Sequence, residues 1–178
     1  MMILAGYSAG RPEDKAPTEL LLDSLPKDRY TVIRRESHAP GDYYTLLADH
    51  WGKADFINIE HDNAPTLEML DKLVGCNFPI CVQAYQKHFP ERDEIMHRKS
   101  INPVPDKAYA WLQEGEEWAD RWGLGVAKIT KEAQDLVDFS KIPDYWMNID
   151  NHLSKAYEAI GIRAHVHWPV SAHNHHDL

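Results

Sequence analysis

Short apolar runs alternate with amphipathic stretches along the first half of the chain. The runs lie at residues 2–8, 30–34, 55–60 and 79–85 and are rich in β-branched or aromatic residues, which is typical of buried strands. Between them, apolar residues recur at helical spacing and are followed by Gly or Pro, which end helices. Strands joined by single helices pair in parallel, so this order predicts a mostly parallel, doubly wound α/β sheet.

The second half resumes this pattern after an irregular stretch. Residues 86–123 mix charges, prolines and aromatic residues without a steady period, which predicts an irregular or partly helical lid. A strand at 124–129 is followed by a helix with Thr130 as its N-cap. A second helix at 149–160 leads into a last strand at 162–168. The end of the chain after this strand is expected to be a loop.

The length, the apolar runs and the net charge of the chain narrow the class of protein. A length of 178 residues suits a single domain with its own core. No apolar run reaches the ~20 residues that span a bilayer, so no membrane span is expected. The first residues lack the basic region of a secretory signal, which favours a cytoplasmic protein. A net charge of -9 argues against nucleic acid as a partner, because nonspecific binding to phosphates needs clustered Lys and Arg.

The two cysteines, Cys76 and Cys81, have neither the spacing of a metal-ligand pair nor that of a redox motif. Free cysteines are among the most buried residue types. We therefore expect two buried free thiols.

Two acids follow the apolar run at residues 55–60. Glu60 and Asp62 fall where the predicted strand leaves the sheet, and open α/β sheets bind ligands at that edge. Carboxylate oxygens suit Mg or Mn, which keep coordination positions open for phosphate. The alternative is that both acids cap the following turn or are solvated.

Histidines gather near the end of the chain. His165 and His167 lie two apart on a predicted strand and so project to one face, and His173, His175 and His176 follow them. Imidazole is a ligand for Mn, Fe, Zn and Ni, so we expect at least one metal ligand here. The alternative is a tail that binds metals adventitiously.

Two further kinds of side chain are candidates for chemistry. Asp150 opens the predicted helix at 149–160, where a carboxylate either caps backbone amides or serves as a base in a cleft. Three indoles precede the last predicted strands and helices, at Trp118, Trp122 and Trp146. They either stack on a sugar ring or fill the core.

With these segments in order, the chain resembles the GT-A fold of nucleotide-sugar glycosyltransferases, particularly the compact family-2-like members. Residues 57–65 (INIEHDNAP) resemble the family's acidic metal motif at the end of a strand. Residues 122–137 (WGLGVAKITKEAQDLV) are similar to the glycine-containing strand and helix beside the acceptor site. Residues 148–173 (NIDNHLSKAYEAIGIRAHVHWPVSAH) resemble the segment in which an acid opens a helix and a histidine follows a strand.

The resemblance implies a metal-ligand set and a base. Asp62, with Glu60 directly or through water, would hold Mn or Mg on the diphosphate of the donor. His173 or His175 would be a further ligand downstream. Asp150 would deprotonate the acceptor hydroxyl.

The resemblance also implies two substrate pockets. The nucleoside would lie at the tips of the first two strands, around Tyr7, Ser8 and Glu36. The acceptor would lie beside Trp122 and Gly123.

The implied activity is metal-dependent transfer of a sugar from a nucleoside-diphosphate sugar to an acceptor hydroxyl, with inversion of the anomeric centre. Residues 1–85 would form the nucleotide-binding half, 86–123 the lid, and 124–178 the acceptor half with the histidine-rich tail. Two other functions remain open on the same acids and histidines. One is a metal-dependent hydrolase of phosphate esters, and the other is a non-catalytic module that binds metal or nucleotide.

Overall fold

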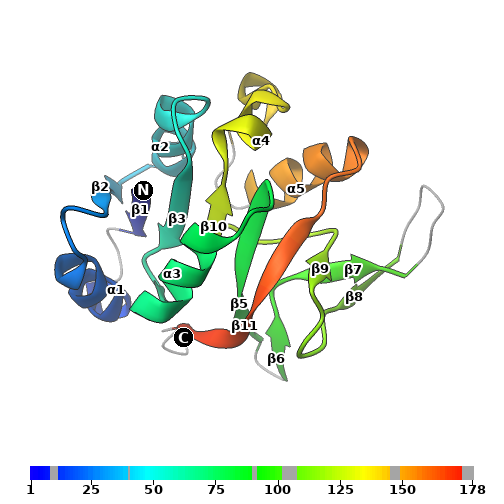
Figure 1. Cartoon of the computed structure of the whole chain (residues 1–178), viewed down its shortest axis with the longest axis horizontal. Coiled ribbons are helices and arrows are strands. Elements are labelled where there is room, and N and C mark those ends of the chain that lie inside the picture. Colours follow the sequence, from blue (N-terminus) through cyan, green and yellow to red (C-terminus); the bar gives the residue numbers. More distant parts are fainter. Residues whose placement is uncertain (9–11, 40, 90–91, 102–107, 145–148, 174–178) are drawn as a thin grey trace.

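The computed structural model describes most of the chain (Figure 1). The described residues are 1–8, 12–39, 41–89, 92–101, 108–144 and 149–173. The strands are β1 (Met2–Ser8), β2 (Thr31–Ser37), β3 (Phe56–Glu60), β4 (Asn63–Ala64), β5 (Ile80–Phe89), β6 (Arg92–Ile95), β7 (Arg98–Ser100), β8 (Tyr109–Trp111), β9 (Trp118–Ala119), β10 (Val126–Ile129) and β11 (Ala164–His173). The helices are α1 (Pro12–Ser24), α2 (Asp42–His50), α3 (Leu67–Gly75), α4 (Lys131–Asp135) and α5 (Ile149–Ala159), with a 3-10 turn at Phe139–Lys141.

The central sheet is mixed and mostly parallel, and its strands follow the order β2-β1-β3-β10-β5-β11-β4. β1 pairs in parallel with β2 and β3, and β5 pairs in parallel with β11. β10 is antiparallel to both of its neighbours, β3 and β5. It follows the irregular segment rather than a crossover helix, so the chain re-enters the sheet in the opposite direction. The predicted α/β class with a mostly parallel sheet is confirmed.

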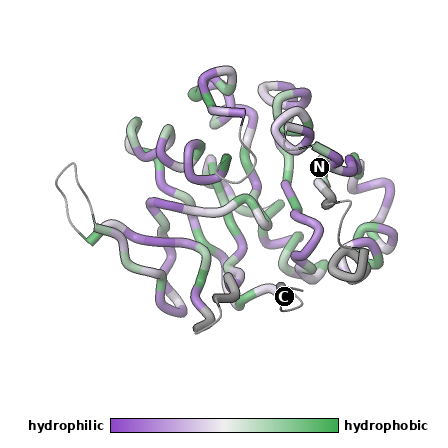
Figure 2. Tube along the Cα trace, turned by 180° about the vertical axis from the view of Figure 1, so that it is seen from behind, coloured by the Kyte–Doolittle hydropathy of each residue, from purple (hydrophilic) through white to green (hydrophobic). Residues whose placement is uncertain are grey.

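Helices cover both faces of the sheet, which gives three layers. On one face, α1 and α3 contribute Leu22, Leu70 and Leu73 to a core cluster with the strands. On the other face, residues of α2, α4 and α5 form a larger cluster that includes Leu46 and Leu153. The central strands between these layers carry hydrophobic segments (Figure 2). Burial on both faces explains why the strands read as continuous apolar runs.

β3 and α3 form where the sequence predicts a strand and a helix. The first four residues of β3 are buried and the last, Glu60, is partly exposed. α3 begins after Thr66, whose hydroxyl accepts a hydrogen bond from the backbone N–H of Met69 at 3.2 Å. This cap lies shortly after the turn that carries Glu60 and Asp62, called the acidic turn below, and so sets the direction in which the chain leaves the sheet edge.

The carboxylate of Asp42 accepts hydrogen bonds from the backbone N–H groups of His38 and Ala39 and so holds the turn before α2. The structure departs from the expected pattern in two other places. β11 continues to His173, where the sequence favoured a loop. In the described part of residues 86–123 the chain forms short strands and no helix, and β7 and β8 pair as a separate sheet beside the main body (Figure 1).

The expectation of free thiols is also wrong, because a disulfide joins Cys76 and Cys81. Cys76 follows the last residue of α3 and Cys81 is the second residue of β5. The tight connection between these elements brings the two Cα atoms to 6.6 Å, within the range that a disulfide spans. Among the described helices, none has the length and apolar character needed to cross a membrane.

Candidate functional site

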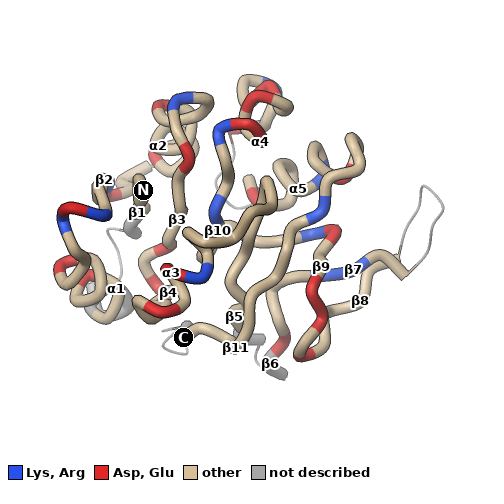
Figure 3. Tube along the Cα trace, viewed as in Figure 1, with Lys and Arg blue, Asp and Glu red and all other residues tan. Residues whose placement is uncertain are grey.

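The acidic turn follows the carboxyl end of β3, in the middle of the sheet. Glu60 ends the strand, and Asp62, which is 9% exposed, lies before β4. The hydroxyl of Thr18, from α1, lies 2.7 Å from the carbonyl oxygen of His61 and 2.8 Å from that of Asn63. Acidic segments next to β3 and β4 are visible in Figure 3. The turn is therefore held in place from the neighbouring helix.

A third carboxylate comes from a distant part of the chain. Asp150 lies in the first turn of α5, and its Oδ1 accepts a hydrogen bond from the backbone N–H of Asn151 at 2.6 Å. Its charge acts on Glu60 and on Tyr43, so the fold places α5 close to the acidic turn. The structure thus brings three of the predicted site residues to one region.

Electrostatics at this edge favour the neutral form of Glu60. Burial, followed by the charges of Asp62 and Asp150, raises the pKa of Glu60 to about 8, and the hydrogen bond from Tyr43 only partly opposes this. Every charge among these causes is negative. A positive ion at this place would relieve the repulsion that the fold imposes.

Tyr43, on α2, links the side chain of Glu60 to that of Asn58, two residues earlier on β3. The Tyr43 hydroxyl donates to Glu60 Oε1 at 3.2 Å and accepts from Asn58 Nδ2 at 2.7 Å. Asn58 Nδ2 also lies 2.6 Å from the carbonyl oxygen of Leu124, just before β10. A Cβ atom on Gly6 would lie 2.6 Å from the Tyr43 ring, so the glycine in β1 makes room for this tyrosine. Burial raises the pKa of Tyr43 well above its usual value, which keeps it a hydrogen-bond donor.

A second tyrosine, Tyr85 on β5, lies beside the glycines that precede β10. Its hydroxyl accepts a hydrogen bond from the backbone N–H of Gly125 at 3.3 Å. A Cβ on Gly125 would lie 2.6 Å from Cζ of Tyr85 and 2.9 Å from Nδ2 of Asn63. A Cβ on Gly123 would overlap the Tyr85 hydroxyl. Burial raises the pKa of Tyr85, and the charges of Glu60 and Asp150 add to this shift.

The oxygen atoms at the turn suit a hard divalent cation. Asn63 Nδ2 donates to Asp62 Oδ1 at 3.0 Å, while the buried Oδ1 of Asn63 has no hydrogen-bond partner among the described residues. Among the described residues, Glu60, Asp62 and Asp150 do not bring three ligand atoms together in the way that a protein-only metal cage requires. Mg typically takes one or two carboxylates and completes its shell with water and substrate phosphate, so the residues present fit such an ion.

The histidines near the end of the chain divide into two places. The backbone of His173 pairs with that of Asn63 where β11 meets β4, so this part of β11 lies beside the acidic turn. His175 lies outside the described residues. His165 and His167 lie at the other end of β11, next to the start of β5.

The residues predicted for the nucleoside lie at the ends of β1 and of the edge strand β2. In the register of β1 with β2, Tyr7 pairs with Glu36 and Ser8 pairs with Ser37. Only the backbone of Tyr7 and Ser8 is described. Glu36 Oε2 lies 3.5 Å from His38 Nε2, and the Glu36 side chain is half-exposed.

The two indoles that the structure describes, Trp118 and Trp122, pack against other aromatic rings. Trp122 is 2% exposed and packs against Tyr157 in the core, with ring centroids 6.0 Å apart. It therefore fills the core and cannot stack on an acceptor sugar. Trp118 packs edge-on against Phe78 at 4.8 Å. Trp146 lies outside the described residues.

Sequence reasoning missed Asn58, Asn63, Tyr43 and Tyr85. Asn58 carried a signal, because it is the one polar residue within the apolar run of β3 before its final acid. Asn63 lies within residues 57–65, the segment that resembles an acidic metal motif. The tyrosines carried no such signal, since aromatic residues on α2 and β5 look like ordinary core.

Comparison with known proteins gives a fold and no family. No protein-family description matches the chain, and no curated protein matches its sequence. Among solved structures, A197 from STIV has a TM-score of 0.53 at 13% identity, over 94% of this chain and 82% of that one. The CMP:2-keto-3-deoxy-manno-octonic acid synthetase complexed with CTP has a TM-score of 0.50 at 8% identity, over 97% of this chain and 91% of that one. The chain therefore has the α/β fold that these proteins share.

Proposed function

We propose that this protein is a metal-dependent glycosyltransferase that moves a sugar from a nucleoside-diphosphate sugar to an acceptor hydroxyl. The proposal rests above all on Glu60 and Asp62 at the carboxyl edge of β3, where the charge of Asp150 also acts on Glu60. Open α/β sheets bind their ligands at this edge. The negative charge that raises the pKa of Glu60 to about 8 is the environment that a divalent cation would neutralise.

Asp62 and Glu60 are the proposed ligands for Mn or Mg, with the amide oxygen of Asn63 beside them. His173 or His175 is proposed as a further ligand, since β11 reaches the acidic turn at His173. When bound, the cation would supply positive charge next to the diphosphate of the donor. Tyr43 holds Glu60 in place through its hydrogen bond.

Asp150 is the proposed base. It comes from a different element than the proposed metal ligands. Its carboxylate would accept the proton of the acceptor hydroxyl as that oxygen attacks the anomeric carbon. Attack from the side opposite to the diphosphate would invert the anomeric centre. The nucleoside is proposed to lie over the ends of β1 and β2, near Tyr7, Ser8 and Glu36.

Trp122 and Gly123, which the resemblance places beside the acceptor, are both buried, so they are proposed to support the acceptor site from beneath and not to contact the acceptor. The backbone N–H of Gly123 already donates to His97 Nδ1 at 3.3 Å.

The test is a product assay with Mn and sugar nucleotides of uracil, guanine, cytosine and thymine, each with a mixture of sugar acceptors. Asp150→Asn should lower transfer by at least about a hundredfold, because a general base contributes ~10²–10⁴. Mn-dependent binding of the nucleotide should stay within about twofold of wild type. Asp28→Asn, at an exposed turn, is the matched control and should transfer normally. Unchanged transfer in Asp150→Asn would refute the assignment of the base.

Nucleotidyl transfer is a second candidate, favoured by the shared fold with the synthetase that was solved with CTP. The same edge would then bind a nucleoside triphosphate and a sugar acid. Release of pyrophosphate from a triphosphate, with no release of diphosphate from sugar nucleotides, would identify this activity. Cleavage of a phosphate ester by water alone, with a phosphorylated product and no acceptor product, would instead identify the hydrolase of phosphate esters.

A further inference from the structure

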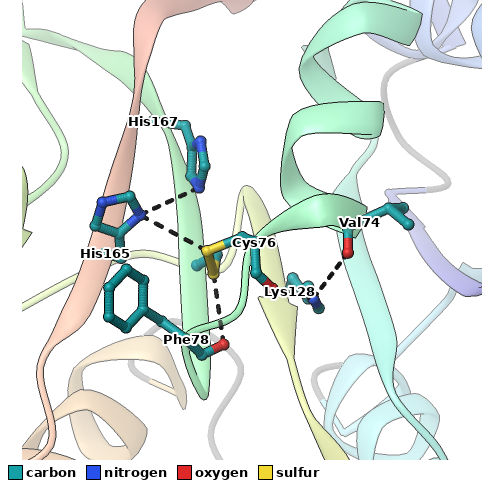
Figure 4. Close-up of a disulfide and its surroundings, with 7 residues drawn as sticks. Val74, Cys76, Phe78, Lys128, His165 and His167 are labelled. Carbon is teal, nitrogen blue, oxygen red and sulfur yellow. Dashed lines mark hydrogen bonds between the residues drawn. A yellow bond between two sulfur atoms is a disulfide. The ribbon is translucent and has the colours of Figure 1, made fainter.

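A second cluster of metal-ligating side chains lies away from the acidic turn, at the amino end of β5 (Figure 4). It consists of Cys76, Cys81, His165 and His167, whose potential ligand atoms all lie within 4.8 Å of one another. Cys81 pairs directly with His165 where β5 runs parallel to β11. His167 lies two residues further along the same face of β11.

We propose that these four residues bind a zinc ion when the two cysteines are reduced. Two thiolates and two imidazoles in a tetrahedral arrangement are a typical zinc ligand set. Cys76 and Cys81 come from the connection between α3 and β5, whereas the histidines come from β11, which follows more than eighty residues later. A zinc ion here would join these two parts of the chain.

Two of the distances within the cluster agree with a tetrahedral site, while the two bonded sulfur atoms would separate on reduction. Cys76 Sγ lies 3.6 Å from His165 Nδ1, and His165 Nδ1 lies 3.3 Å from His167 Nε2. With Zn–S of about 2.3 Å and Zn–N of about 2.05 Å, tetrahedral geometry places a sulfur and a nitrogen about 3.6 Å apart and two nitrogens about 3.3 Å apart. Both separations are thus already those of ligands around one ion.

Hydrogen bonding alone explains the cluster less well. His165 Nδ1 faces both Cys76 Sγ and His167 Nε2. A ring nitrogen carries either one proton or one lone pair, so it can donate to only one of these neighbours. An ion between the three atoms would use the lone pairs of both imidazoles and of the thiolate together.

The surroundings hold the four ligands in place. Phe78 packs against the His165 ring with centroids 4.6 Å apart, and Trp118 packs against it from another side at 5.1 Å. Lys128 donates to the carbonyl oxygens of Cys76 at 2.7 Å and Val74 at 3.1 Å, which fixes the connection that carries Cys76. Such outer contacts orient metal ligands and support their affinity.

The disulfide makes the site dependent on redox state. Reduction by an external dithiol transfers two electrons and two protons to the Cys76–Cys81 bond, which yields two thiols and oxidises the dithiol to its own disulfide. Zinc then binds as both thiol protons leave to solvent. Reoxidation of the two thiolates by an external disulfide would release the ion, so the metal and the disulfide exclude each other.

The test is the zinc content of the whole protein after reduction with a phosphine and dialysis against zinc chloride. We expect one additional zinc per chain in the reduced protein relative to protein oxidised with diamide. His165→Ala/His167→Ala should lose this zinc. Two matched controls should keep it: His173→Ala/His175→Ala/His176→Ala, which removes the other histidines near the chain end, and Asp62→Asn, which alters the acidic turn.

A cobalt spectrum of the wild-type protein tests the proposal without relying on the folding of the double variant. Reduced wild-type protein with cobalt should show thiolate-to-metal charge transfer and the intense visible bands of a tetrahedral ion, and both should disappear on oxidation. A cobalt spectrum without thiolate bands, or equal zinc content in the reduced and oxidised proteins, would overturn the proposal and leave the disulfide as a purely structural link.

Discussion

Replacement of Glu60 by Gln should change how the stability of the protein depends on pH. The folded protein holds the Glu60 proton up to a pKa of about 8 because of burial and the charges of Asp62 and Asp150. In the unfolded chain the same group ionises near its ordinary value of about 4.3. Gln has no proton to lose, and it can still accept the hydrogen bond from Tyr43.

The direction in which stability changes with pH follows from proton binding. Between these two pKa values the folded state binds more protons than the unfolded state, so the free energy of unfolding of wild type falls as the pH rises. The stabilising contribution of Glu60 is complete below the lower value and is lost as the pH rises to about 8. If the whole shift in the pKa of Glu60 acted on stability, the free energy of unfolding would fall by about 1.4 kcal/mol per pH unit. Because Glu60 is partly exposed, we expect about half of that, or about 1.4 kcal/mol between pH 6 and pH 8.

The assay is urea denaturation of wild type and Glu60→Gln at pH 6, 7 and 8 with EDTA. The variant should gain stability relative to wild type at each step, and saturating Mn should abolish this gain by favouring ionised Glu60. Glu68→Gln is the matched control, since that side chain is 78% exposed on α3. If the curves of wild type and Glu60→Gln stay parallel from pH 6 to pH 8, the acidic edge does not have the electrostatics described here.

Two further predictions concern the local structure. Gly125→Ala should destabilise the protein by roughly 1–3 kcal/mol, because the new Cβ would lie 2.6 Å from the Tyr85 ring. Gly75→Ala, whose new Cβ would have no atom within 4 Å, should not destabilise it. Urea denaturation compares the two variants, and equal effects would contradict the close packing at Gly125. Thr130→Ala should cost about 1 kcal/mol, because the hydroxyl accepts the Ala133 N–H at the start of α4, and Thr130→Ser should keep most of the stability. Equal losses in Ala and Ser would show that the cap does not act through its hydroxyl.

Local pattern was sufficient to predict the unit around β3. Four buried residues, a terminal acid and a threonine cap lie next to one another in sequence, and each acts over a few residues. The same holds for the helix that starts after Thr130 and for the start of α5 at Ile149. Such features depend on neighbours in the chain, which a single sequence displays.

Features that depend on distant contacts could not be predicted. The antiparallel direction of β10 follows from the path of residues 86–123, which have no regular period. Tyr43 reaches Glu60 only because Gly6 on a neighbouring strand leaves room for its ring. The meeting of Cys81 with His165 is a matter of strand register, which the spacing of cysteines does not reveal.

The most direct test of the proposed site is thermal unfolding of wild type and Asp62→Asn with EDTA, Mn or Mg, each alone and with UDP, GDP, CDP or dTDP. A nucleotide at ~100 times its dissociation constant adds about 2.7 kcal/mol, which corresponds to a rise in Tm of roughly 5–10 °C for a domain of this size. We expect this rise in wild type only when metal and one of the nucleotides are present together, and we expect Asp62→Asn to lose it. No rise in wild type, or an equal rise in Asp62→Asn, would contradict a metal and nucleotide site at the acidic turn.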